Sequence, residues 1–414
     1  MKRSFISTRE SIIITIGVLL FTAIAVYVST PHVFNNGVSQ TPDSNRNTNT
    51  DTISEIPTYT TEPFAKVSPP VQSGAVYSIS TGSVIARTIS SGAVSTVQKL
   101  DSTESIISAA YTEKNGAMVF VRNEGSTDSA YVLRKGASSP IKLVDASHVW
   151  TGNDEPRNKR ISGVSLSPNG QFASVVIVGW EMCDDRIFDV ARGTLVVSVP
   201  CGATTWSPDG TRLVDAGVNG MTSVNKLALS APNDPATFKD VEWSTVKGDV
   251  STVYDASTHT LIRGFIAAAW RSNDRVVLQT EGDVDTGSYV LEYEITSNTL
   301  SLLAHIPLLS GQAGIVATED YVVLMDDKFG VYTINLDTGE VTRGLTSIGF
   351  DGSSRYNLYT LGTDTAVLTV RTYRNDQSDV VTAAYGIDPA SKQYWEISVK
   401  SDELFIGVTR LGTR

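Results

Sequence analysis

The feature that most constrains the fold is a repeated pair of short β-rich runs joined by a tight turn. Its two clearest copies read ISGVSLSPNGQFASVVIV at residues 161–178 and CGATTWSPDGTRLVDAG at residues 201–217. In both copies the turn carries Asn or Asp followed by Gly, which is a strong signal for a β-hairpin. Four looser copies have apolar runs on either side of a polar turn, and they occupy residues 106–122, 265–281, 314–325 and 356–371.

A second hairpin follows in five places, as a strand, a polar or acidic turn and another strand. These copies lie at residues 187–197, 253–262, 291–302, 331–342 and 384–397. Two hairpins in tandem make a four-stranded meander, and the turns of the first hairpin recur every 40 to 64 residues. A period of this length built from four short strands is typical of a β-propeller blade.

Six turn sites predict six blades, and the two ends of the repeat region predict a seventh. Residues 74–99 contain three strand-like runs, and residues 403–410 contain one more. If the last run pairs with the first three, the ring closes and leaves no open sheet edge between its ends. We therefore expect an all-β domain over residues 73–411 that forms a seven-bladed β-propeller. Six blades and a β-sandwich are the alternatives.

The turn motifs also resemble those of a known class of propellers. SPNG at residues 167–170 and SPDG at residues 207–210, the second preceded by Trp206, are similar to the repeats of TolB-type propellers. WD-repeat-like domains and the propellers of prolyl oligopeptidases share this motif. The resemblance covers most of residues 100–400 and implies a propeller of the bacterial cell envelope that acts mainly through protein–protein contact. TolB proteins differ in having six blades and a preceding α/β domain.

The first thirty residues predict a membrane anchor. Residues 11–30 read SIIITIGVLLFTAIAVYVST, and about twenty apolar residues in a helix span a bilayer. Three basic residues precede this segment, so the positive-inside rule places residues 1–10 in the cytoplasm and residues 31–414 outside. A cleaved signal peptide is the alternative, with a small-x-small cleavage pattern at residues 23–25. In both interpretations the rest of the chain is exported from the cytoplasm.

Residues 31–72 predict a flexible stalk between the anchor and the propeller. Of the 38 residues from 35 to 72, 21 are Ser, Thr, Asn or Pro, and no periodic apolar pattern occurs among them. Such a segment buries too little apolar surface to offset the entropy that folding would cost. We expect it to hold the propeller away from the membrane.

The charge of the chain excludes one class of partner. It contains 44 Asp and Glu against 33 Lys and Arg, which gives a net charge of -11. Nucleic acids attract basic surfaces, so a nucleic-acid partner is not expected. The membrane is expected as a partner through residues 11–30. The other partner is expected to be a second envelope protein, or a cationic or polymeric ligand.

The sequence contains none of the common catalytic motifs. It has no G-x-S-x-G, no H-E-x-x-H and no phosphate-binding G-x-x-x-x-G-K-[ST] loop, and its four histidines lack metal-ligand spacing. The Asn and Asp of the SPNG-type turns are expected to shape the turns, because these side chains bond to nearby backbone. No cofactor and no metal site are predicted.

The candidate interaction face is set by the order of strands within a blade. If the strands are named a to d in chain order, the b–c turns and the d–a links lie on one face, which we name the rim. The expected b–c turns are rich in acidic residues, and two longer segments of the rim, 145–160 and an expected b–c insertion at 217–250, carry tryptophans. The candidate residues are Trp150, Glu181, Asp184, Asp185, Trp243, Glu281, Asp283, Asp285, Asp326 and Asp327.

These observations predict a membrane-anchored, extracytoplasmic propeller that acts as a binding or scaffolding module of the cell envelope. The alternative is a propeller enzyme, a hydrolase or lyase acting on a glycan or a lactone with carboxylates of the rim. That enzyme would need two carboxylates that converge in one pocket and differ in pKa.

The two cysteines are expected to form a disulfide bond. Cys183 falls at a b–c turn and Cys201 at the d–a link of the same blade, so both belong to the rim. An exported protein folds in an oxidising compartment, where such a bond persists. Two buried free thiols are the alternative.

Overall fold

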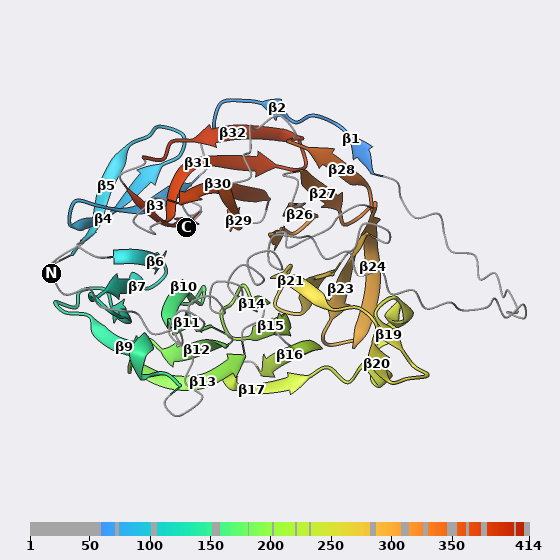
Figure 1. The fold of residues 1–414 in the computed structure, drawn as a ribbon. Helices are drawn as coiled ribbons and strands as arrows, with labels where there is room; N and C mark the ends of the chain where they lie inside the picture. Colours follow the sequence, from blue (N-terminus) through green and yellow to red (C-terminus); the bar gives the residue numbers. More distant parts are fainter. Residues whose placement is uncertain are drawn as a thin grey trace, which may run out of the picture. The chain divides into compact units, whose positions relative to one another are not determined.

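The chain folds into seven β-sheets that follow one another round a ring in chain order, as Figure 1 shows in a computed structural model. The structure describes residues 59–70, 74–100, 106–150, 158–180, 182–200, 203–219, 222–231, 233–281, 287–307, 314–325, 330–345, 354–361, 364–373, 379–400 and 403–409. The prediction of an all-β, seven-bladed propeller is confirmed. The proposed anchor at residues 11–30 lies outside the described residues, and no helix within them has the length and apolar character needed to cross a membrane.

Each blade is an antiparallel sheet of four strands in the order a, b, c, d from the innermost strand outward. Blade 1 is β33 (Leu404–Thr409), β3 (Ala75–Ser80), β4 (Ser83–Thr88) and β5 (Val94–Lys99). Blade 2 is β6 (Ile106–Thr112), β7 (Ala117–Asn123), β8 (Asp128–Leu133) and β9 (Ile141–Asp145). Blade 3 is β10 (Arg160–Leu166), β11 (Phe172–Val178), β12 (Cys183–Asp189) and β13 (Thr194–Pro200).

The other four blades repeat this order. Blade 4 is β14 (Ala203–Trp206), β15 (Leu213–Asn219), β16 (Thr222–Ala231) and β17 (Asp234–Asp240). Blade 5 is β21 (Phe265–Trp270), β22 (Arg275–Thr280), β23 (Ser288–Glu294) and β24 (Thr299–Ile306). Blade 6 is β25 (Ile315–Ala317), β26 (Tyr321–Met325), β27 (Val331–Asn335) and β28 (Val341–Gly344). Blade 7 is β29 (Ser354–Leu361), β30 (Thr365–Tyr373), β31 (Asp379–Asp388) and β32 (Gln393–Ile397).

The ring is closed by strands from opposite ends of the described chain. β33 pairs antiparallel with β3, with Val408 opposite Val76. The predicted contribution of residues 403–410 to the blade begun by residues 74–99 is confirmed. Arg87 of β4 and Glu403, just before β33, form an ion pair of 2.6 Å whose side chains are only 8% and 4% exposed. Closure therefore combines strand pairing with a buried pair of charges.

The SPNG-type turns connect neighbouring blades on the face opposite the rim. Asn169 accepts a hydrogen bond from Ser167 Oγ at 2.8 Å, which closes its own turn. Its Nδ2 donates to the carbonyl oxygen of Gly210 in the corresponding turn of blade 4, at 2.9 Å. Asn115 makes the same kind of bond to Gly170 across blades 2 and 3, at 2.8 Å. These Asn side chains therefore shape their turns, as the sequence predicts, and also join one blade to the next.

The core lies between the blades. Central strands such as β7 are buried on both faces, so their sequences read as continuous apolar runs; residues 117–121 are AMVFV and all five are buried. Between blades 4 and 5, Leu227 packs in one cluster with Leu278 and Leu291. Each sheet has two apolar faces and needs a neighbouring sheet to cover each of them. The core is therefore complete only when the ring is closed.

The strand assignment expected for blade 4 is wrong. Residues 253–262 are not its outer hairpin: they form β19 (Tyr254–Asp255) and β20 (Thr260–Leu261), a small separate hairpin in the link to blade 5. The outer strands are β16 and β17, from the segment 217–250 that the sequence suggested was an insertion. β17 contains Pro235 and several charges, which an outermost strand tolerates because one of its edges has no strand to bond.

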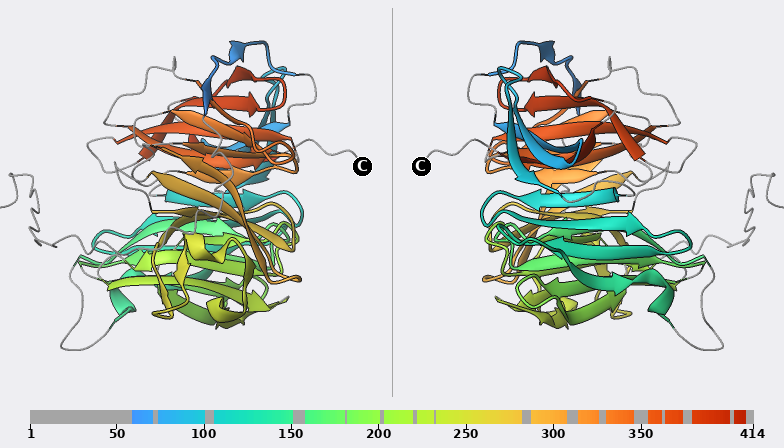
Figure 2. Two further views of the ribbon diagram at one scale, coloured as in Figure 1. Left: turned by 90° about the vertical axis from the view of Figure 1, so that its right-hand side faces the viewer. Right: turned by 90° about the vertical axis from the view of Figure 1, so that its left-hand side faces the viewer.

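Residues 59–70, which the sequence assigned to the stalk, lie along the outer edges of two blades. β1 (Thr60–Thr61) pairs in parallel with β28, and β2 (Ala65–Lys66) pairs in parallel with β32. Figure 2 shows this blue segment outside the orange and red blades. Between the two strands, Phe64 is buried against Gly344, where a larger side chain would clash with its ring. Strand pairing and the buried Phe64 together thus hold a segment whose composition is otherwise typical of a linker.

A third short strand extends blade 5. β18 (Lys247–Gly248) pairs in parallel with β24 and lies in the link after blade 4. The same link contains the 3-10 helices η2 (Trp243–Thr245) and η3 (Val250–Thr252). The link of residues 241–264 is therefore folded against blade 5.

Candidate functional site

The rim contains the b–c turns and d–a links in the structure, as expected from the alternation of strand direction. Its b–c turns in blades 2 and 3 are residues 124–127 and 179–182. Of the acidic candidates, Glu181, Asp283, Asp285, Asp326 and Asp327 lie outside the described residues. Asp184, Asp185 and Glu281 can be placed.

Asp184 and Asp185 lie on strand β12 rather than in the turn before it. Asp184 is ion-paired with Arg186 at 2.8 Å and accepts a hydrogen bond from Ser198. Its side chain is only 13% exposed. Asp184 is therefore engaged within blade 3, whereas Glu281, at the end of β22, is exposed.

Asp185 is buried in the joint between blades 3 and 4, with 1% of its surface exposed. Its carboxylate accepts hydrogen bonds of 2.5 Å from Ser174 of β11 and from Thr204 of β14. Burial raises the pKa of Asp185, and the nearby carboxylates of Asp215 and Asp184 raise it further, while the two hydroxyl groups oppose this shift. The expectation that Asp185 belongs to an exposed acidic surface is wrong, because its side chain points between the blades.

A second group of polar residues occupies the rim of blade 2. Glu124 accepts hydrogen bonds from the hydroxyl groups of Tyr131 and Ser129 and from Lys142. These bonds, that of Tyr131 first, lower the pKa of Glu124. The carboxylate is therefore held in its charged form by neighbours of its own blade.

The two tryptophan candidates are not exposed anchors. Trp243 is 8% exposed and stacks on Phe265 with ring centroids 5.6 Å apart, so it belongs to the core between blades 4 and 5. Trp150 follows the 3-10 helix η1 (Ala146–His148), is half-buried and has a φ of 52°. Its carbonyl oxygen accepts a hydrogen bond from Lys159 at 3.1 Å. Both side chains pack links against blades, and the structure does not bring them together.

The most exposed large apolar side chain of the described residues is one that the sequence reasoning missed. Trp180, at the tip of the b–c turn of blade 3, is 74% exposed, and Met182 in the same turn is 46% exposed. The turn is closed by a hydrogen bond of 2.7 Å from the backbone N of Gly179 to the carbonyl oxygen of Met182. The sequence signal was available, because large apolar residues stand where a turn normally carries polar ones.

The cysteine next to this turn is oxidised. Cys183, the first residue of β12, is disulfide-bonded. Cys201 is the other cysteine of the sequence and lies outside the described residues, so the pairing of the two stays a prediction. Among the described residues, no three His, Cys, Asp or Glu side chains gather as metal ligands would.

The comparisons with known proteins assign no family to the chain. No family model matches the chain, and no curated protein does, so the resemblance to TolB-type propellers stays a prediction. Similar solved structures include the β-propeller domain of the Trilobed protease from Pyrococcus furiosus, described as having an open velcro topology. It is 12% identical with a TM-score of 0.43, over 85% of this chain and 98% of that one.

Two further structures show a similar degree of likeness. A structure from a study of two prolyl endopeptidases is 11% identical with a TM-score of 0.42; the match covers 72% of this chain and 51% of that one, so this chain spans about half its length. U3-55K is 10% identical with a TM-score of 0.40, over 75% of this chain and 83% of that one. At these identities the comparisons carry no argument about activity.

Proposed function

We propose that this protein is a binding or scaffolding module of the cell envelope, held outside the membrane by residues 11–30, and that it contacts its partner through the rim. The observation that carries the proposal is the exposure of Trp180 at the tip of a short turn. Tryptophan is enriched among the residues that dominate binding energy at protein interfaces, since it contributes a large contact area at low entropic cost.

The setting of Trp180 supports the same function. Its turn is short, hydrogen-bonded and followed directly by a disulfide-bonded cysteine. A side chain presented on a rigid support loses little freedom on binding. Met182 beside it adds a flexible apolar surface. The partner we favour is another envelope protein with an apolar pocket for the indole ring.

Those carboxylates of the rim that the structure describes favour binding over the hydrolase or lyase alternative. Asp184 is paired with Arg186, and Glu124 is bonded to Tyr131 and Lys142. Catalytic carboxylates of a glycosidase instead converge on one substrate bond, one of them as an acid with a raised pKa. The raised pKa of Asp185 belongs to a side chain enclosed between two blades, with 1% exposure.

The size of the native complex tests whether the partner binds at the rim. Full-length protein extracted in mild detergent is expected to migrate as a complex larger than itself. Trp180→Ala should shift it to the size of the free protein, because the variant loses the most exposed large apolar side chain of the described residues. Leu195→Ala is the matched control, since Leu195 is 47% exposed on the outermost strand of the same blade. Equal loss of the complex in both variants, or no loss of the complex in Trp180→Ala, contradicts the proposal.

The membrane attachment has a separate test. If residues 11–30 are a retained anchor, the amino-terminal sequence of protein extracted from membranes starts at or near Met1. A start at Val26 would mean that the segment is a cleaved signal peptide.

A further inference from the structure

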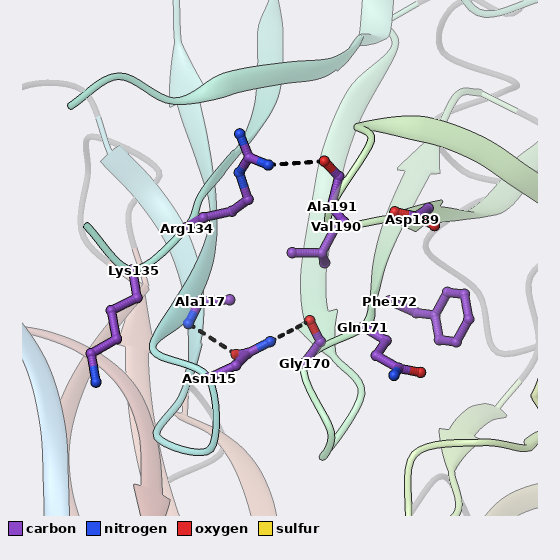
Figure 3. Close-up of a pocket in the computed structure, with 10 residues that line it drawn as sticks. All are labelled: Asn115, Ala117, Arg134, Lys135, Gly170, Gln171, Phe172, Asp189, Val190 and Ala191. Atoms are coloured by element: carbon purple, nitrogen blue, oxygen red, sulfur yellow. Dashed lines mark hydrogen bonds between the residues drawn. The ribbon is translucent and has the colours of Figure 1, made fainter. Parts of the chain in front are cut away.

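A cavity of about 510 Å³ opens between blades 2 and 3 on the face opposite the rim. Hydrogen bonds join the two blades at two places around it (Figure 3). Asn115 Nδ2 donates to the carbonyl oxygen of Gly170 at 2.8 Å, and Arg134 Nη1 donates to that of Ala191 at 3.0 Å. The cavity is therefore framed before any ligand arrives, and its volume is in the range of small-molecule and peptide pockets.

Two basic side chains from the c–d turn of blade 2 line this cavity. Arg134 and Lys135 are exposed, and neither forms an ion pair within the part of the chain that the structure describes. The carboxylate of Asp189, also in the wall, is engaged instead with Arg192, which donates its backbone N–H at 2.8 Å and places its guanidinium at 3.6 Å. The cavity thus has a positive edge in a chain whose net charge is -11.

The inner wall of the cavity is apolar. Ala117 and Val190, from opposite blades, line it and are themselves 1% and 3% exposed. Phe172 also lines the cavity, but its ring points away from it in Figure 3 and stacks on Trp206 of blade 4, with ring centroids 5.7 Å apart. A positive edge above an apolar wall suits a ligand that has a negative group at one end and a short hydrocarbon part at the other.

We propose that this cavity binds a carboxylate carried on a short aliphatic group. The carboxylate lies at Arg134, and the aliphatic part lies against Ala117 and Val190. Arg134 has further N–H donors besides the Nη1 that bonds to Ala191, so its guanidinium can form charge-assisted hydrogen bonds with a carboxylate. The Lys135 side chain points away from Arg134 in Figure 3 and adds only its charge to this edge of the cavity. Two sources carry this chemistry: a free short-chain acid and the carboxyl terminus of a partner's extended chain.

Binding is measured by calorimetric titration of the full-length protein in detergent with four probes. Isovalerate represents the free acid, and N-acetyl-Ala-Ala-Val with a free carboxyl terminus represents the chain end; the amide of each is its neutral counterpart. We expect at least one acid to bind and its amide to bind much more weakly. Arg134→Gln, which loses the guanidinium, should weaken that binding about tenfold, the value of one charge-assisted hydrogen bond.

Lys114→Gln is the matched control. Lys114 is an exposed lysine of the a–b turn of the same blade and does not line the cavity, so this variant should bind as the unmodified protein does. A melting curve for each variant confirms that it is folded, and Lys135→Gln should weaken binding less than Arg134→Gln, because its ammonium group points away from Arg134. Tighter binding of the peptide assigns a partner's chain end, and tighter binding of isovalerate assigns a free acid. Failure of both acids to bind, equal binding of acid and amide, or equal losses in Arg134→Gln and Lys114→Gln overturns the proposal.

Discussion

At the scale of the residue, the most unusual feature is the carboxyl group of Asp185. It is 1% exposed, and among the described residues its hydrogen-bond partners are the hydroxyl groups of Ser174 and Thr204. The charged groups near it are the carboxylates of Asp215 and of its strand neighbour Asp184, and both disfavour its ionised form. A buried carboxyl group in such surroundings is held neutral more easily than charged.

Asp185 should therefore make the protein less stable as the pH rises. Its pKa in the folded protein is raised above the value of about 3.9 typical of an unfolded chain. The stability linked to this group is fully present below the unfolded value and is lost as the pH rises through the folded value. Asp185→Asn should raise the free energy of unfolding relative to the unmodified protein, and this gain should be larger at pH 8 than at pH 4. Denaturant unfolding at both pH values measures it. The same difference at both pH values contradicts this account, and Asp337→Asn, at an exposed position in blade 6, is the control.

At the scale of the element, the turns between strands a and b are fixed by contacts with the neighbouring blade. Gly210 has a φ of +73°, and a Cβ atom there would lie 2.6 Å from Asn169 Cγ and 2.7 Å from its backbone N. Gly92 has a similar φ of +68°, but nothing lies within 4 Å of its Cβ position. Substitution at Gly92 therefore measures the cost of backbone strain alone, and substitution at Gly210 measures that cost plus the loss of contact between blades.

Alanine substitution at these two glycines should have unequal costs. Gly92→Ala should lower the free energy of unfolding by about 1–2 kcal/mol, the cost of a left-handed conformation for an L-residue. Gly210→Ala should cost clearly more, because it also displaces Asn169 and breaks the bond that joins blades 3 and 4. Urea unfolding of both variants measures the difference, and equal costs would show that the contact between turns contributes nothing.

The outer hairpin of blade 3 makes the disulfide prediction specific. In the described strands, Asp184 of β12 lies opposite Pro200 of β13. Continuing this register by one residue predicts Cys201 opposite Cys183, and directly opposed residues have Cα separations that a disulfide bond can span. We expect no free thiol in denatured, non-reduced protein. Cys183→Ser with Cys201→Ser should cost about 3 kcal/mol of stability. Two titratable thiols exclude the bond.

How much of the molecule could be predicted differs between elements. The blades with a clear turn motif, such as that of residues 161–178, were assigned correctly, because Asn-Gly and alternating apolar residues are local signals. Strands β16 and β17 were missed because an outermost strand packs little and tolerates proline and charge. Trp180 was missed because the exposed fraction of a side chain depends on the whole fold and not on the local sequence.

At the scale of the whole molecule, stability depends on closing the ring. Blade 1 brings together distant parts of the chain, because β33 pairs with β3 and Arg87 forms a buried ion pair with Glu403. The exposed pair of Lys66 and Glu396 joins the outer strand β2 to blade 7 instead. Charges that are buried together are costly to separate, whereas exposed pairs contribute little.

Removing one partner of the buried pair should therefore be severe. Glu403→Ala leaves the guanidinium of Arg87 buried and should cost about 3–5 kcal/mol. Glu396→Ala removes a carboxylate from a pair of the same length, 2.6 Å, and should cost far less. Thermal unfolding of the two variants tests this, and similar melting temperatures would argue against the ion pair as a component of closure.

The central claim is that a closed propeller outside the membrane contacts its partner through the rim at Trp180. The most direct measurement places a photo-reactive amino acid at position 180 in intact cells, and at position 337 as the control, since Asp337 is exposed in a c–d turn on the opposite face. The account predicts a discrete cross-linked product with another envelope protein from position 180 and none from position 337. No product from position 180, equal products from both positions, or a product with a cytoplasmic protein would contradict it.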